Sequence, residues 1–356
     1  MNYKSGIVQR GRPAVLPYLY GSLLLGLFAI LWSATFAKHL VAAEDGATYY
    51  VLGKALYQGE GYVSINTPVA IPANNPPPGY PLLVALTMAL WSADFVAIKV
   101  VNGIFLMLAI LLLFFLFVRL SDHAHLAFVA ALAVLCNAHL LNKSMVMMSE
   151  SSFLFFSTAA LLFFTRLKEE EDFGQPQIYL LLICLVASYY IRTMGVALVG
   201  AVRLELAWQR RWKYLDFVAV GYVVAALPWY IRGRSLGGDS YLGPLLSINP
   251  YRPELGTAGW SDLVLRLYEN AQRYVYREIP DGLPYYIDRD WTTGPTLSEW
   301  SLGLLLIALA GCGFYQLQAH RRLIVVYVAA IGGIILLWPQ VWTGTLFCNL
   351  LSPCYC

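Results

Sequence analysis

Long apolar runs separated by short polar segments set the pattern of this chain. The first run covers residues 15–37, and the others cover about 97–118, 126–141, 151–165, 178–191, 194–207, 215–231, 299–317 and 323–338. A helix needs roughly 20 apolar residues, and at least about 17, to cross the hydrocarbon of a bilayer. The pattern therefore predicts an all-α, polytopic transmembrane helical bundle of about nine spans. We expect it to form a single integral membrane domain over 1–356.

The composition agrees with a bilayer rather than water as the solvent. Hydrophobic residues make up 59% of the chain and charged residues 13%, well below the roughly 25% charge of a soluble domain. The formal net charge of +3 is too small to indicate a nucleic acid partner. We therefore expect membrane lipids around the chain and no nucleic acid.

The short apolar stretch 80–91 decides the topology. If it does not span and the N-terminus is cytoplasmic, every short basic loop lies in the cytoplasm, as the positive-inside rule requires. These loops contain Arg119, Arg166, Lys168, the segment 203–213, Arg321 and Arg322. We therefore predict that 80–91 is a short helix on the outer face of a bacterial inner membrane.

This orientation gathers the unusual polar segments on the outer face. They are a first outer loop over 38–79 with a juxtamembrane helix, the junction 142–150, the turn near Arg192, and a large outer loop over 232–298. Within the large loop, 261–277 has the spacing of an amphipathic helix. A binding or catalytic site on the outer face is the function that this clustering favours.

Glu44 and Asp45 precede an amphipathic pattern in which Tyr49, Leu52 and Ala55 recur at helical spacing. The pattern predicts a helix lying on the membrane. Two explanations of the acidic pair stay open. Acidic residues stabilise a helix N-terminus by roughly 0.3–1 kcal/mol, and a carboxylate at the membrane surface can act as a general base or a metal ligand. Three prolines at 76–78 then predict a stiff, extended return to the membrane.

Glu150 lies where the chain enters the apolar run 151–165. A carboxylate at that depth is costly unless it faces a cavity or a partner, which indicates a functional site. The alternative is a helix that Ser149 caps, with Glu150 in its first turn. Lys143 and Arg192 are expected on the same face and favour the functional interpretation.

Arg192 and Arg232 each follow an apolar run at its predicted outer end. Guanidinium groups at the membrane surface suit a phosphate, which accepts forked hydrogen bonds. For a single arginine, however, contact with lipid headgroups is the more common explanation.

The order of these motifs resembles the membrane glycosyltransferases of the GT-C superfamily, in the branch of protein O-mannosyltransferases and aminoarabinose transferases. The similar segments are DGATYYVLGKALYQGEGY at 45–62, PPPGYP at 76–81, MSES at 148–151, SYYIRTMG at 188–195 and LPWYIR at 227–232. Members commonly have an acidic first outer loop, a proline-rich return and a second acid after a further pair of spans. The resemblance covers most of the chain to about residue 298, through short motifs in the same order.

The resemblance implies transfer of a sugar from a polyprenyl-phosphate donor to a lipid, glycan or protein acceptor of the cell envelope, on the outer face. Asp45 would be the catalytic carboxylate with Glu44 beside it, and Glu150 the second acid. Arg192 and Arg232, with Lys143, would be candidates for the donor phosphate. A divalent metal ion is a candidate cofactor, for which Asp45 and Glu150 would be the ligands.

The competing class is a transporter or flippase of lipid-linked sugars, and a non-catalytic membrane subunit is a third. A transporter favours charged residues at mid-span and paired half-repeats, whereas the charges here concentrate at predicted outer ends. The chain also departs from the family near its end, where Leu346 stands about where an arginine is expected. We therefore predict that 340–356, which ends in clustered cysteines, is a truncated or aberrant C-terminus.

Overall fold

The computed structural model describes residues 15–38, 45–237, 242–250, 252–283, 294–317 and 320–339. These residues are mostly helical, with one two-stranded hairpin, so the predicted all-α class is confirmed. Glu44 and the segment 340–356 lie outside the described residues.

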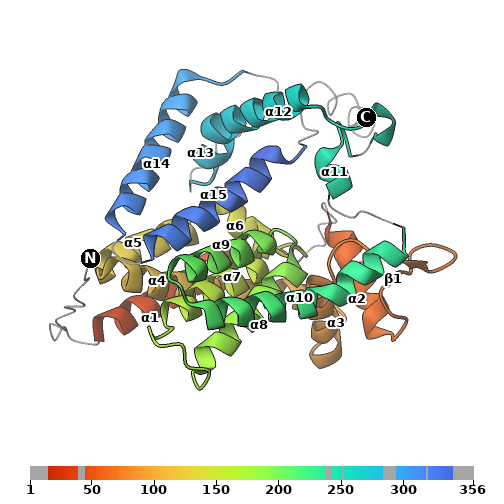
Figure 1. The fold of residues 1–356 in the computed structure, drawn as a ribbon, viewed down its shortest axis with the longest axis horizontal. Coiled ribbons are helices and arrows are strands. Elements are labelled where there is room, and N and C mark those ends of the chain that lie inside the picture. The colour runs from red at the N-terminus through yellow and green to blue at the C-terminus, as the bar shows by residue number, and fades with distance from the viewer. Residues whose placement is uncertain are drawn as a thin grey trace.

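Every predicted apolar run contains a helix (Figure 1). The helices of these runs are α1 (Val15–Thr35), α4 (Phe95–Ser121), α5 (Ala124–Leu135), α6 (Ala138–Ser144), α7 (Glu150–Thr165), α8 (Pro176–Ile191), α9 (Gly195–Trp208), α10 (Trp212–Ser235), α14 (Leu297–Gln316) and α15 (Arg321–Leu337). Within the described residues, four of them (α1, α4, α10 and α14) are long and apolar enough to cross a membrane. Joining α5 and α6, which meet at a bend of 60°, gives up to five. The prediction of about nine spans therefore stays a prediction.

The bend between α5 and α6 corrects the prediction of one continuous helix over 126–141. Asn137 precedes α6, and its side chain accepts a hydrogen bond from the backbone N–H of Leu140. An asparagine in this position satisfies a free N–H of a new helix, so it favours a second helix start over continuation of the first.

Close packing between the helices holds the bundle together. Around α4, Leu106, Ile110 and Phe114 are buried against Leu24 of α1 and Leu135 of α5. In lipid the hydrophobic effect does not drive helices together, so this interdigitation supplies much of the stability. Large apolar side chains that stay exposed along span-length helices, such as Leu304 and Leu305 of α14, indicate an integral membrane protein.

Polar contacts between helices gather at the two ends of the bundle. At one end, Arg119 of α4 donates to the carbonyl of Thr165, where α7 finishes, and Arg322 at the start of α15 pairs with Glu205 near the end of α9 (3.4 Å). At the other end, Asn102 near the start of α4 bonds to the segment before α7. Helices α4, α7 and α9 therefore run in one direction, and the predicted basic loops share the end opposite Glu150 and Arg192. Which end faces the cytoplasm stays a prediction.

Two short helices and a hairpin cover the end where α7 begins (Figure 1). They are α2 (Gly46–Tyr57), α3 (Gly79–Leu90), β1 (Val63–Ser64) and β2 (Ile71–Pro72). Helix α3 has 12 residues, a length of about 18 Å, which is too short for hydrocarbon about 30 Å thick. This length agrees with the interpretation of 80–91 as a helix that does not span.

Helix α2 confirms the predicted amphipathic helix but corrects its surroundings. Tyr49, Leu52 and Ala55 are buried within the protein, and Gly53 lies so close to α3 that a Cβ there would be 2.5 Å from a methyl group of Val84. The apolar face therefore packs on α3 rather than on lipid. The extended segment is also shorter than predicted, because Pro78 has the helical φ and ψ of −75° and −4° at the cap of α3.

The described part of the large loop lies across the end of α15. It contains α11 (Leu242–Leu246), a 3-10 turn η1 (Pro253–Leu255), α12 (Trp260–Arg273), a π-helical segment η2 (Tyr274–Glu278) and α13 (Ile279–Asp281). Asn270 of α12 donates to the carbonyls of Leu336 and Trp338, and Arg266 donates to that of Leu337. These carbonyls at a helix C-terminus have no partner within the helix, so α12 caps α15 and is held there. The predicted helix over 261–277 is confirmed, with its last turn in the π-helical form.

Candidate functional site

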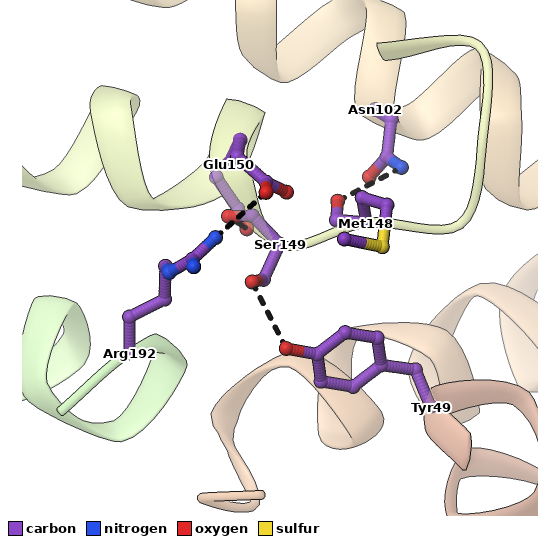
Figure 2. Close-up of polar contacts among 7 residues, drawn as sticks. Tyr49, Asn102, Met148, Ser149, Glu150 and Arg192 are labelled. Atoms are coloured by element: carbon purple, nitrogen blue, oxygen red, sulfur yellow. Dashed lines mark hydrogen bonds and ion pairs between the residues drawn. The ribbon is translucent and has the colours of Figure 1, made fainter. Parts of the chain in front are cut away.

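Glu150 and Arg192 meet at the end of the bundle, from helices that run in opposite directions (Figure 2). Glu150 is the first residue of α7, and Arg192 directly follows α8. Arg192 Nη1 lies 2.8 Å from Glu150 Oε1, with the side chains 32% and 26% exposed. The pair therefore sits at a partly open surface, where a substrate could reach it.

A hydrogen bond between Tyr49 and Ser149 joins α2 to the start of α7. The phenol oxygen lies 3.2 Å from the Ser149 hydroxyl, and both side chains are buried. Ser149 makes no side-chain cap hydrogen bond to α7. The alternative prediction, a helix capped by the Ser149 side chain, is therefore wrong. The hydroxyl instead fixes where the first outer loop meets Glu150.

Asn102 supports the backbone just before Ser149. Its amide donates to the carbonyls of Val146 and Met148 at 2.8 and 3.2 Å, and its oxygen accepts a hydrogen bond from Tyr80. Asn102 is only 1% exposed. A buried polar group without a hydrogen-bond partner costs free energy, so these bonds stabilise the segment. The segment that presents Glu150 is thereby tied to both α3 and α4.

Asp45 lies beside this pair at the start of α2, one turn before Tyr49. It is exposed and makes no cap hydrogen bond to α2. Gly46 brings the chain against the segment before Glu150, since a Cβ there would lie 3.3 Å from the carbonyl oxygen of Met147. The carboxylate is close enough to act electrostatically on Tyr49 and Arg192. Asp45 stands at the N-cap position of α2, where its charge also stabilises the helix dipole, so both explanations of this acid stay open.

The electrostatics favour one fixed cation and one neutral phenol. Burial opposes the charge of Arg192, but Glu150, Tyr49 and Asp45 together outweigh it, and the pKa of the guanidinium lies above its usual value. Burial raises the pKa of the Tyr49 phenol, and the charges of Asp45 and Glu150 add to that effect. The site therefore holds the charged guanidinium of Arg192 close to the carboxylates of Asp45 and Glu150. The guanidinium suits a phosphate group, and a carboxylate can accept a proton.

One oxygen of Glu150 remains available for a ligand. Oε2 is buried and has no hydrogen-bond partner among the described residues, although buried polar atoms are nearly always paired. A hydroxyl group or a hard cation would satisfy it. No group of three His, Cys, Asp or Glu side chains that could hold a metal ion occurs in the described part of the chain. Two carboxylates still fit Mg²⁺, which is commonly held by one or two carboxylates together with substrate phosphates.

Among the described residues, no ion pair joins Arg232 or Lys143 to Glu150. Arg232 donates to the carbonyls of Ala73 and Tyr62 at 3.2 and 2.8 Å, so it ties α10 to the hairpin of the first outer loop. Lys143 lies in the last turn of α6, and no ion pair among the described residues joins it to Glu150. Three of the predicted residues, Asp45, Glu150 and Arg192, thus lie together, while the roles of Arg232 and Lys143 toward a phosphate stay predictions.

Sequence reasoning missed the buried polar residues of α4. Lys99 is 1% exposed, and its ammonium group donates to the carbonyl of Ala37 at 3.0 Å, near the rings of Phe36 and Phe95. It therefore links the end of α1 to the start of α4. The sequence does contain a signal for these residues. Lys99 and Asn102 are three positions apart at the start of an apolar run, where polar side chains usually have a function.

Comparison with known proteins gives only distant structural likeness. No protein-family model and no curated protein matches the chain. A solved structure that is similar is that of the S. cerevisiae protein O-mannosyltransferase Pmt1–Pmt2 complex bound to the sugar donor, with 15% sequence identity and a TM-score of 0.49. The match covers 65% of this chain and 36% of that chain. A likeness at this level carries no conclusion about activity.

Proposed function

We propose that this chain is a membrane glycosyltransferase that moves a sugar from a polyprenyl-phosphate donor to a lipid, glycan or protein acceptor of the cell envelope. The observation that carries the proposal is the meeting of Asp45, Glu150 and Arg192 at one end of an apolar bundle. These groups come from three distant segments, and they are the charged groups that sugar transfer from a lipid phosphate requires. The sequence resemblance to the GT-C superfamily supports the same reaction.

In this reaction the acceptor oxygen or nitrogen attacks the anomeric carbon of the sugar. The bond from that carbon to the phosphate oxygen breaks, and the electron pair leaves with the polyprenyl phosphate. Asp45 is the exposed carboxylate and would take the proton of the acceptor as general base. Arg192 would stabilise the phosphate as its negative charge increases.

Glu150 has two parts in the proposed site. Oε1 holds the guanidinium of Arg192 in place through the 2.8 Å ion pair. Oε2, which has no partner among the described residues, would accept a hydrogen bond from another hydroxyl of the acceptor or the sugar, since the proton of the attacking group goes to Asp45. If a divalent metal binds, Asp45 and Glu150 would hold it, and it would supply positive charge for the phosphate.

The membrane setting suits such a donor. Its prenyl chain stays in the hydrocarbon while its phosphate lies at the interface, so a site at the end of a bundle can reach the reacting bond. A flippase of lipid-linked sugars would instead favour charged residues at mid-span. The charged site residues lie at helix ends, which favours the enzyme.

The test is turnover by the purified chain in liposomes. Polyprenyl-phosphate donors carrying hexoses or pentoses are added with simple sugar, lipid and peptide acceptors, and released polyprenyl phosphate is measured by mass spectrometry. The proposal expects release from at least one donor. Intact donors that cross the bilayer without cleavage would contradict it and identify a flippase.

A further inference from the structure

The C-terminal end of α10 is bonded to the first outer loop through Arg232. Its guanidinium donates from Nε to the carbonyl of Ala73 (3.2 Å) and from Nη2 to the carbonyl of Tyr62 (2.8 Å). Tyr62 directly precedes β1 and Ala73 directly follows β2, and the N–H of Ala73 also donates to the carbonyl of Tyr62 (3.1 Å). Arg232 therefore holds both strands at the base of the hairpin.

Apolar packing at the same place continues from α10 to α2. The ring of Trp229, one turn before Arg232, meets that of Tyr62 edge to face, with the centroids 5.6 Å apart. Trp229 is 7% exposed, and Leu52 of α2 is fully buried in the same cluster. Leu52 follows Asp45 by about two helical turns, roughly 10 Å along the axis. Because α2 is one short helix, a displacement at the hairpin base would also displace Asp45.

The same end of α10 is bonded to α8, close to Arg192. Pro228 lies inside α10 and has no N–H, so the carbonyl of Val224 lacks its usual partner within the helix. The adjacent carbonyl, that of Ala225, accepts a hydrogen bond from the phenol of Tyr190 (2.6 Å). Tyr190 lies in the last turn of α8, two positions before Arg192. The end of α10 is thus attached to the segment that carries Arg192 as well as to the first outer loop.

The contacts of Arg232 differ from those expected of a phosphate ligand. Two of its donors bond to backbone carbonyls of the hairpin, and its guanidinium lies over the ring of Tyr62, 5.9 Å from the centroid. A phosphate group at Arg232 would compete with the carbonyls that fix the hairpin. The geometry therefore favours a role in placing the first outer loop.

We propose that Arg232 is a positioning residue for the proposed sugar transfer, on which this role rests, and not a ligand of the donor phosphate. It holds the hairpin on α10, so that α2 keeps the carboxylate of Asp45 beside Arg192. Asp45 makes no side-chain cap hydrogen bond to α2, so its place depends on where α2 as a whole lies. A misplacement of about 1 Å in a reacting group can cost about 10²-fold in rate.

Amide hydrogen exchange tests the contact without any turnover. The wild type, Arg232→Gln and Arg234→Gln are compared in nanodiscs. Arg234 is exposed and lies over the ring of Tyr230, 5.7 Å from the centroid, which makes it a matched control two positions away. We expect residues 62–73 to exchange at least about tenfold faster in Arg232→Gln, because charge-assisted hydrogen bonds to the hairpin are lost. Arg234→Gln is expected to exchange at the wild-type rate, and unchanged exchange in Arg232→Gln would overturn the proposal.

Kinetics and ligand binding separate positioning from phosphate contact. In the donor-cleavage assay, Arg232→Gln is expected to lower kcat by about 10–10²-fold while KM for the donor stays within about twofold. Native mass spectrometry is expected to show wild-type affinity of Arg232→Gln for polyprenyl phosphate, and about tenfold lower affinity for Arg192→Gln.

Two results would overturn the positioning role. One is an unchanged kcat in Arg232→Gln, and the other is a loss of polyprenyl phosphate affinity equal to that of Arg192→Gln. A wild-type chain that releases no polyprenyl phosphate would contradict the proposed function and the positioning role with it, whereas the exchange rates would still report whether Arg232 holds the hairpin.

Discussion

The ion pair between Glu150 and Arg192 makes a measurable prediction about stability. Breaking a fully buried ion pair by removing one partner costs about 3–5 kcal/mol, whereas exposed pairs contribute about 0–1 kcal/mol. The two side chains are 26% and 32% exposed with 2.8 Å between charged atoms. We therefore expect an intermediate interaction free energy of about 1–2 kcal/mol.

A double-mutant cycle measures this quantity. Glu150→Gln, Arg192→Gln and the double variant are unfolded by denaturant titration in mixed micelles, and the free energies of unfolding are compared with that of the wild type. We expect the double variant to be less destabilised than the sum of the single variants by about 1–2 kcal/mol. Agreement with that sum within about 0.3 kcal/mol would refute the reasoning.

A second ion pair of the chain provides the matched control. Arg273 Nε lies 2.8 Å from Glu278 Oε1, with the side chains 20% and 32% exposed, but these residues lie in the large loop away from Asp45. A cycle on this pair is expected to show an interaction of similar size. Its variants are expected to leave sugar transfer unchanged, whereas Glu150→Gln and Arg192→Gln reduce it.

Three further predictions concern the packing around the site. Gly79→Ala is expected to destabilise the protein by about 1–3 kcal/mol in a thermal unfolding assay, because its Cβ would lie 2.5 Å from the carbonyl carbon of Tyr190; Gly26→Ala, which has open space, is the control. Asn102→Ala is expected to lower the free energy of unfolding by about 1–3 kcal/mol, because it leaves buried carbonyls without donors; an unchanged value would contradict the anchoring role. Burial raises the pKa of Tyr49, so the unfolded state loses this proton first and stability falls as the pH rises above about 10. Tyr49→Phe should make that loss smaller in alkaline unfolding curves, and equal slopes would argue against it.

The sequence was most informative where one physical rule dominates. Apolar runs predicted the helices of the bundle because a bilayer demands backbone hydrogen bonds within each segment. The break at Asn137 was missed, because a single capping hydrogen bond is invisible in a hydropathy pattern. The burial of α2 against α3 was missed for a related reason: Gly53 and Val84 are far apart in sequence, and only their contact turns an apparent membrane face into a protein interface.

The candidate site was predicted in part. Carboxylates and arginines at helix ends stand out in an apolar sequence, and Asp45, Glu150 and Arg192 do lie together. The same rule predicted that Arg232 belongs to the site, but in the structure its guanidinium donates hydrogen bonds to the carbonyls of Tyr62 and Ala73. A charge pattern shows where a guanidinium lies along the chain, while its partners depend on how the first outer loop folds back.

The central claim is that sugar transfer takes place beside Asp45. Two variants of the same helix test it most directly in the donor-cleavage assay: Asp45→Asn at the start of α2 and Lys54→Gln in its last turn. Loss of a general base predicts that Asp45→Asn releases polyprenyl phosphate about 10²–10⁴ times more slowly, with unfolding unchanged, while Lys54→Gln turns over at the wild-type rate. Wild-type turnover by Asp45→Asn would contradict the claim.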